Sequence, residues 1–76
     1  MSILRTDYTI ETIHELQQGT LPELIGVRVV ALAQGTLTGK LAVRPQLLAP
    51  NGFLHAATVI GLADTCCGYA CMAHLP

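Results

Sequence analysis

The hydrophobic pattern changes near residue 50, where a long apolar run replaces shorter segments that alternate. From Ala56 to Ala73 no proline interrupts the chain, and the helix-tolerant residues Ala, Leu and Met recur. The pattern predicts one helix over residues 56–73, about 27 Å long. Because apolar residues lie on all its sides, we expect other structure, such as a curled sheet, to wrap around it.

One carboxylate stands in the middle of this apolar run, at Asp64. Burying an unpaired carboxylate is costly, so Asp64 needs a chemical reason for its position. The length alone would suit a membrane helix, but a carboxylate near the bilayer centre costs about 2.5 to 3.5 kcal/mol. No cluster of Lys or Arg flanks either end of the run. We therefore expect no membrane span.

Two segments before this run have the pattern of strands. Residues 26–34 are rich in β-branched side chains, and residues 37–44 alternate between apolar and polar positions. Gly35 lies between them and allows the positive φ of a tight turn. Pro45 ends the second segment, and residues 46–52 follow as a loop. The pattern predicts a β-hairpin.

The N-terminal part predicts short helical structure. Residues 9–18 place apolar side chains on one side of a helix, with Thr12 and Glu15 at the spacing of a capping box. Thr9 is the alternative cap. Residues 21–24 predict a turn or a single helical turn, because a proline stands near the start.

Composition adds a constraint on size and association. The 76 residues allow one domain. Of these residues 51% are hydrophobic and 12% are charged, whereas about 25% are charged in an ordinary soluble domain. This is more apolar surface than a small monomer can bury. We expect self-association as a dimer or tetramer, or that the chain is the first part of a longer domain. The net charge of −1 provides no basic patch, so no nucleic-acid partner is expected.

The three cysteines, Cys66, Cys67 and Cys71, are an odd number within one predicted helix. They cannot form an internal disulfide framework, and the N-terminus has no apolar signal core, so a reducing, cytoplasmic location is expected. Cys67, Cys71 and His74 share one helical face at i, i+4 and i+7. These residues would supply only three ligands, fewer than the four of a structural zinc site, and they contain no C-x-x-C pair, so we expect no metal.

The order of elements, with the segments VRPQLLAPNG and LHAATVIGLADTCCGYACM, resembles a known family. This is the hotdog-fold acyl-CoA thioesterases of the phenylacetate-degradation (PaaI-like) type, whose signature is Asn, then His-Gly-Gly, then Leu-Ala-Asp inside the central helix. The likeness covers residues 21–75, as the N-terminal half of that fold. Its anchors are Asn51-Gly52, His55, Leu62-Ala63-Asp64 and Gly68-Tyr69. It implies a single partial α+β domain over residues 1–76, with the long helix against an antiparallel sheet and the C-terminal strands absent.

The resemblance implies hydrolysis of an acyl-CoA thioester to free acid and CoA, without a cofactor. Asp64 matches the family's acidic base or nucleophile, and desolvation in an apolar helix would raise its reactivity. The backbone N–H of Ala56, at a helix N-terminus, would polarise the thioester carbonyl. His55 and Asn51 would orient the substrate.

Each assignment has a simpler alternative. Asp64 could face a water-filled crevice, His55 could be a structural histidine, and Asn51 could belong to a plain Pro-Asn-Gly turn. Ala56-Ala57 stands where the family has Gly-Gly. The two methyl groups leave less room for a substrate carbonyl to reach the backbone. A non-catalytic acyl-CoA-binding or dimerisation module is therefore the alternative function. A hotdog dehydratase is disfavoured because its His-Phe-Pro-Gly type motif is absent.

The spacing of the two main candidates predicts a shared site. Asp64 follows His55 by nine residues, which is half a turn beyond two full helical turns and about 13.5 Å along the axis. One chain could not bring both side chains to one thioester carbon. A two-fold dimer with antiparallel central helices would pair His55 of one chain with Asp64 of the other.

Overall fold

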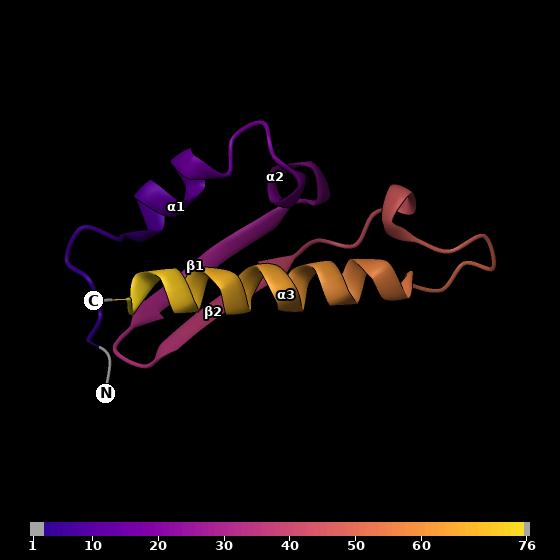
Figure 1. Cartoon of the computed structure of the whole chain (residues 1–76). Helices are drawn as coiled ribbons and strands as arrows, with labels where there is room; N and C mark the ends of the chain where they lie inside the picture. The colour runs from indigo at the N-terminus through magenta and orange to yellow at the C-terminus, as the bar shows by residue number, and fades with distance from the viewer. Residues whose placement is uncertain (1–2, 76) are drawn as a thin grey trace.

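The computed structural model describes residues 3–75 and shows an α+β chain (Figure 1). The elements are α1 (Ile10–Leu16), α2 (Leu21–Ile25), β1 (Val27–Ala33), β2 (Thr36–Leu41), the 3-10 turn η1 (Pro45–Leu47) and α3 (Ala56–Ala73). The two strands form one antiparallel sheet, and α3 runs beside it. The segment before α3, which includes η1, extends beyond the hairpin (Figure 1). The hairpin and the bounds of α3 are as expected from the sequence.

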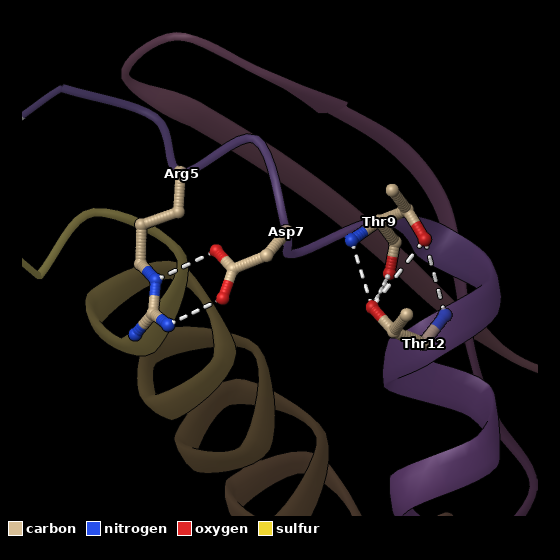
Figure 2. A network of polar contacts seen from close by, with 4 residues as sticks. All are labelled: Arg5, Asp7, Thr9 and Thr12. Carbon is tan, nitrogen blue, oxygen red and sulfur yellow. Dashed lines mark hydrogen bonds and ion pairs between the residues drawn. The ribbon is translucent and has the colours of Figure 1, made fainter.

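The cap of α1 is Thr9, as Figure 2 shows. Its side chain accepts the N–H of Thr12 at 3.2 Å, and the Thr12 hydroxyl accepts the N–H of Thr9 at 2.8 Å. Of the two expected caps, the alternative, Thr9, is correct, and the capping box of Thr12 with Glu15 is wrong. Thr9 has the extended backbone that a cap requires, whereas Thr12 is already inside the first turn. The helix is also shorter than residues 9–18, because it ends at Leu16.

The segment before α1 contains a bidentate ion pair between Arg5 and Asp7 (Figure 2). Arg5 Nε and Nη2 donate to the two carboxylate oxygens of Asp7 at 3.0 and 2.6 Å, and these hydrogen bonds lower the pKa of Asp7. The backbone N–H of Arg5 donates to the carbonyl of Ala73 at 2.7 Å. The N-terminal segment is therefore attached to the last turn of α3.

The hairpin pairs Val27 with Leu41 at its open end and Ala33 with Thr36 beside a two-residue turn. Gly35 in that turn has φ 79°, which glycine adopts without strain. The second strand ends at Leu41 rather than at Arg44 as expected. The reason is that β1 begins at Val27, so residues 42–44 have no partner strand to pair with.

Side chains of α1 and of its C-cap residue bind the outer edge of β1 at its start. His14 Nε2 accepts the N–H of Val29 at 3.1 Å, and Gln17 Nε2 donates to the carbonyl of Val27 at 2.8 Å. The other amide atom of Gln17, Oε1, accepts the hydroxyl of Tyr69 from α3 at 2.7 Å. Gln17 is only 7% exposed, so this one amide joins α1, β1 and α3 in the core.

Gly39 of β2 lies close against α3. A Cβ added at Gly39 would lie 2.4 Å from Sγ of Cys66, so only glycine fits there without a shift. Most of the opposite side of α3 remains exposed, and within residues 3–75 only Thr58 and Ala73 of the helix are buried. The expectation of a helix wrapped on all sides is wrong for this part of the chain. Two strands about 4.8 Å apart cover only one side of a helix about 10 Å across.

By length and composition, α3 could cross a membrane, since its 18 residues have a mean hydropathy of 1.3. A core helix of a soluble protein has the same properties. In this fold the helix packs against β2, and Asp64 stands near its middle. The absence of a membrane span stays a prediction.

Candidate active site

The loop that leads into α3 is fixed at Leu47. Its carbonyl accepts two hydrogen bonds, from the N–H of His55 at 3.1 Å and from the hydroxyl of Thr58 at 2.9 Å. Leu47 and Thr58 are both buried. The first turn of α3 is therefore anchored to η1, which sets the position of the candidate residues around it.

Asn51 lies at the tip of this loop. The N–H of Gly52, which has φ 89°, donates to the carbonyl of Ala49 at 2.9 Å, and the side-chain oxygen of Asn51 accepts the N–H of Phe53 at 3.2 Å. This is the local geometry of the Pro-Asn-Gly turn that the sequence offered as an alternative. The side chain is exposed, and its use in catalysis stays a prediction.

His55 caps α3. Its backbone is extended, with φ −66° and ψ 137°, and its Nδ1 accepts the N–H of Ala57 at 2.9 Å. A backbone N–H is always a donor, so Nδ1 carries no proton and the proton of the neutral ring is on Nε2. The exposed ring therefore presents an N–H donor through Nε2.

The neighbouring backbone N–H of Ala56 is left without an acceptor. Ala57 donates to His55 Nδ1, and the N–H groups of Thr58 and Val59 reach the carbonyl of His55 at 2.9 and 3.4 Å. Among residues 3–75, Ala56 alone in this turn donates to no group. Helix N-termini carry partial positive charge, so this free N–H is suited to stabilise a developing oxyanion.

Asp64 lies on the side of α3 that the sheet does not cover, and it is exposed. The expectation that apolar surroundings desolvate this carboxylate is wrong within residues 3–75, because β2 packs on the other side, at Leu62 and Cys66. Nine helical residues separate Asp64 from His55 by about 13.5 Å along the axis. The chain therefore brings His55 and Ala56 together and holds Asp64 apart from them.

The cysteines differ in burial. Cys66 is half-buried, and burial raises the pKa of its thiol, whereas Cys67 and Cys71 are exposed free thiols. Both ring nitrogens of His74 are engaged, with the N–H of Gly35 and the carbonyl of Ala70. In the described part of the chain, no three His, Cys, Asp or Glu side chains gather as a metal site would require.

Sequence reasoning missed two features, the Gln17–Tyr69 hydrogen bond and the bridge from His74 to Gly35. The partners are 52 and 39 residues apart, so no local sequence pattern predicts these hydrogen bonds. The close approach of Gly39 to Cys66 had a partial signal, since a glycine inside an alternating strand indicates that another element comes near.

These features define an α+β chain in which a long helix lies against an antiparallel sheet, with a free N–H at the start of the helix. No protein-family model matches the chain, and no curated protein matches its sequence. Among solved structures, thioesterase PA1618 from Pseudomonas aeruginosa, crystallised as a mutant, has the same fold, with a TM-score of 0.89 and 25% sequence identity. The match covers 99% of this chain and 54% of the thioesterase chain, so this chain spans about half the length of that protein. The hotdog-type arrangement inferred from the sequence is confirmed at the level of fold.

Proposed function

We propose that this chain forms part of a thioesterase that hydrolyses acyl-CoA to a free acid and CoA. The observation that carries the proposal is the unbonded N–H of Ala56 at the N-terminus of α3. Such a donor suits a carbonyl oxygen that becomes negative as a nucleophile adds to its carbon. The solved thioesterase of the same fold supports this choice of chemistry.

In this mechanism Asp64 supplies the base or the nucleophile. As a base, its carboxylate takes a proton from water while the water oxygen bonds to the thioester carbon. The Ala56 N–H holds the resulting oxyanion, which collapses as the carbon–sulfur bond breaks and CoA leaves as the thiolate. As a nucleophile, Asp64 would instead form an anhydride that water then opens. His55 and Asn51 orient the substrate in either route.

The site requires two chains, because Asp64 lies too far from Ala56 within one. We place the two-fold axis so that α3 of each chain runs antiparallel to its partner along the side that the sheet leaves open. That side carries Ile60, which lies one helical turn before Asp64 and is 65% accessible, and its burial would stabilise the pair. Such an assembly would be a dimer or a tetramer, and the free thiols fit a cytoplasmic location.

The proposal is tested by removing the Ala56 N–H without disturbing the helix. Proline has no N–H and is favoured at the first helical position, and His55 already has the extended backbone that a following proline requires. Ala56→Pro should keep the helical circular dichroism and lower kcat by about 100- to 1,000-fold. Ala56→Gly retains the N–H and should keep the activity.

Turnover should be measured by chromatography of free CoA over a panel of acyl-CoAs, because the exposed thiols of Cys67 and Cys71 would react with a thiol reagent. Asp64→Asn should lower kcat by about 100-fold or more and leave folding intact. Equal activity in Ala56→Pro and Ala56→Gly would refute the role of this N–H. Binding of acyl-CoA without release of CoA would instead identify the non-catalytic module, which the alanines at positions 56 and 57 favour.

A further inference from the structure

His74, at the end of α3, connects that helix to the tip of the hairpin. Its Nε2 accepts the backbone N–H of Gly35 at 2.9 Å, and its Nδ1 lies 2.7 Å from the carbonyl oxygen of Ala70. Gly35 is in the two-residue turn between β1 and β2, 39 residues away in sequence. One imidazole ring therefore spans two elements that only the tertiary fold brings together.

The two contacts determine which ring nitrogen carries the proton. The carbonyl of Ala70 can only accept, so Nδ1 must be the donor, and the N–H of Gly35 can only donate, so Nε2 must be the acceptor. A neutral ring with its proton on Nδ1 satisfies both bonds. The other neutral tautomer and the imidazolium ion each place an N–H of the ring against the N–H of Gly35.

We propose that His74 is a proton-sensitive latch, which binds the N–H of Gly35 at the hairpin tip when neutral and releases this N–H when protonated. The proton is added to Nε2, so the bond from Gly35 is lost while the bond from Nδ1 to Ala70 remains. That remaining bond becomes charge-assisted, and the last carbonyls of a helix favour a cation. Acid therefore breaks the contact between the ring and Gly35 and leaves the ring attached to the helix. The side-chain oxygen of Gln34 still accepts the N–H of Leu4 at 2.7 Å, so the tip stays joined to the N-terminal segment.

The ionisable groups around His74 are few, so a change in this contact between about pH 7 and pH 5 can be attributed to its imidazole ring. His74 lines a cavity of about 370 Å³ with four other residues, Gly35, Ala70, Cys71 and Leu75, of which Cys71 alone is titratable. The tip, residues 34–36, has no ionisable side chain. The N-terminal segment bonded to Ala73 contributes Arg5 and Asp7, which are paired with each other, and Tyr8, over whose ring the Arg5 guanidinium lies. Imidazole is the side chain that commonly changes charge between about pH 7 and pH 5.

The other two histidines also accept a backbone N–H, His14 from Val29 and His55 from Ala57. A global unfolding curve would therefore mix three contributions, and the measurement has to report on the tip itself. Hydrogen exchange of the Gly35 amide, followed by NMR, does so. Comparison of variants at the same pH cancels the intrinsic dependence of exchange on pH.

Two variants distinguish the presence of a hydrogen-bond acceptor at position 74 from its protonation. In His74→Gln the side-chain oxygen can reach the N–H of Gly35 but does not titrate, and His74→Ala has no acceptor. At about pH 7.5, wild type and His74→Gln should exchange Gly35 roughly two- to tenfold more slowly than His74→Ala, as expected for one hydrogen bond. At about pH 5, wild type should match His74→Ala, whereas His74→Gln should keep its protection.

The latch is refuted if wild type keeps its protection of Gly35 after the His74 ring has titrated, or if His74→Ala is equally protected at about pH 7.5. The ring nitrogen shifts of wild type give a second test that needs no variant. They should show the proton of neutral His74 on Nδ1, and a proton on Nε2 would overturn the proposal.

Discussion

The contact between Gly39 and Cys66 allows the packing of sheet on helix to be tested with one methyl group. In Gly39→Ala the new Cβ would lie 2.4 Å from Sγ of Cys66. Favourable contacts between heavy atoms begin at about 3.5 Å, so the side chain of Cys66 or the strand has to move by roughly 1 Å. The other neighbours of this Cβ, the carbonyl of Arg28 at 3.6 Å and Leu62 at 3.9 Å, are at ordinary contact distance.

The expected cost follows from two opposing effects. Overpacking costs about 1–3 kcal/mol, and we take the middle of this range because Gly39 and Cys66 are half-buried rather than in the core. Replacing glycine inside a strand recovers about 0.5–1 kcal/mol, because the unfolded chain loses freedom and Gly39 has no positive φ. The midpoints of the two ranges leave a net cost of about 1 kcal/mol. We therefore expect Gly39→Ala to lower the free energy of unfolding by about that amount, which changes the folded-to-unfolded ratio roughly fivefold.

The assay is urea unfolding at a fixed protein concentration, together with the rate at which the thiol of Cys66 is labelled, measured by mass spectrometry. Cys67 and Cys71 are exposed and should label quickly in every variant. Cys66 is half-buried, so it should label more slowly than these two thiols in wild type and faster in Gly39→Ala, where its side chain is displaced. Gly68→Ala is the matched control, because nothing lies within 4 Å of its added Cβ and alanine is favoured inside a helix.

The double variant decides whether the clash is the cause. In a Cys66→Ala background the sulfur is gone, so Gly39→Ala should become neutral or slightly stabilising, with a coupling of about 1–3 kcal/mol between the sites. If Gly39→Ala destabilises equally with and without the Cys66 sulfur, or does not destabilise at all, the proposed packing of β2 on α3 is wrong.

Two further predictions concern the core amide and the shared site. Tyr69→Phe leaves Oε1 of buried Gln17 without its donor and should cost about 1–3 kcal/mol in urea unfolding. Burial raises the pKa of Tyr69 above 10.0 and that of Cys66 above 9.0, so both favour folding while protonated. Stability should be full below about pH 9 and fall as pH rises through the raised values, and Tyr69→Phe should remove the upper part of that fall. Mixing His55→Ala with Asp64→Asn chains under subunit exchange should restore up to about half of wild-type activity per hybrid dimer, and no recovery with exchange verified by mass would exclude a site shared between chains.

Local patterns were sufficient for the elements of this fold. The bounds of α3 were predicted as Ala56–Ala73, and the alternation of residues 37–44 identified the second strand. Its end was misplaced because pairing is set by the partner strand, which starts at Val27. The choice between Thr9 and Thr12 as cap depended on backbone geometry that both sequence patterns permit.

The candidate site was predictable where it is local. The turn at Asn51 was predicted from its neighbours, and so was the start of the helix at Ala56. The capping role of His55 was not predicted. The surroundings of Asp64 were not predictable, because the burial of a helix face depends on what packs against it. Apolar residues on every side of α3 indicate that the helix is to be covered, but they do not indicate by which segment.

The bonds from His14 and Gln17 to Val29 and Val27 have a consequence for how this sheet can grow. A strand at the edge of a sheet is a template for another chain, and proteins commonly block such edges to prevent aggregation. Here side chains of α1 already use the outward N–H of Val29 and the outward carbonyl of Val27. Within residues 3–75 no strand pairs with the outer edge of β2. Any strand that extends this sheet near Val27–Val29 must therefore be added beside β2, so this end of the hairpin can be extended in one direction only.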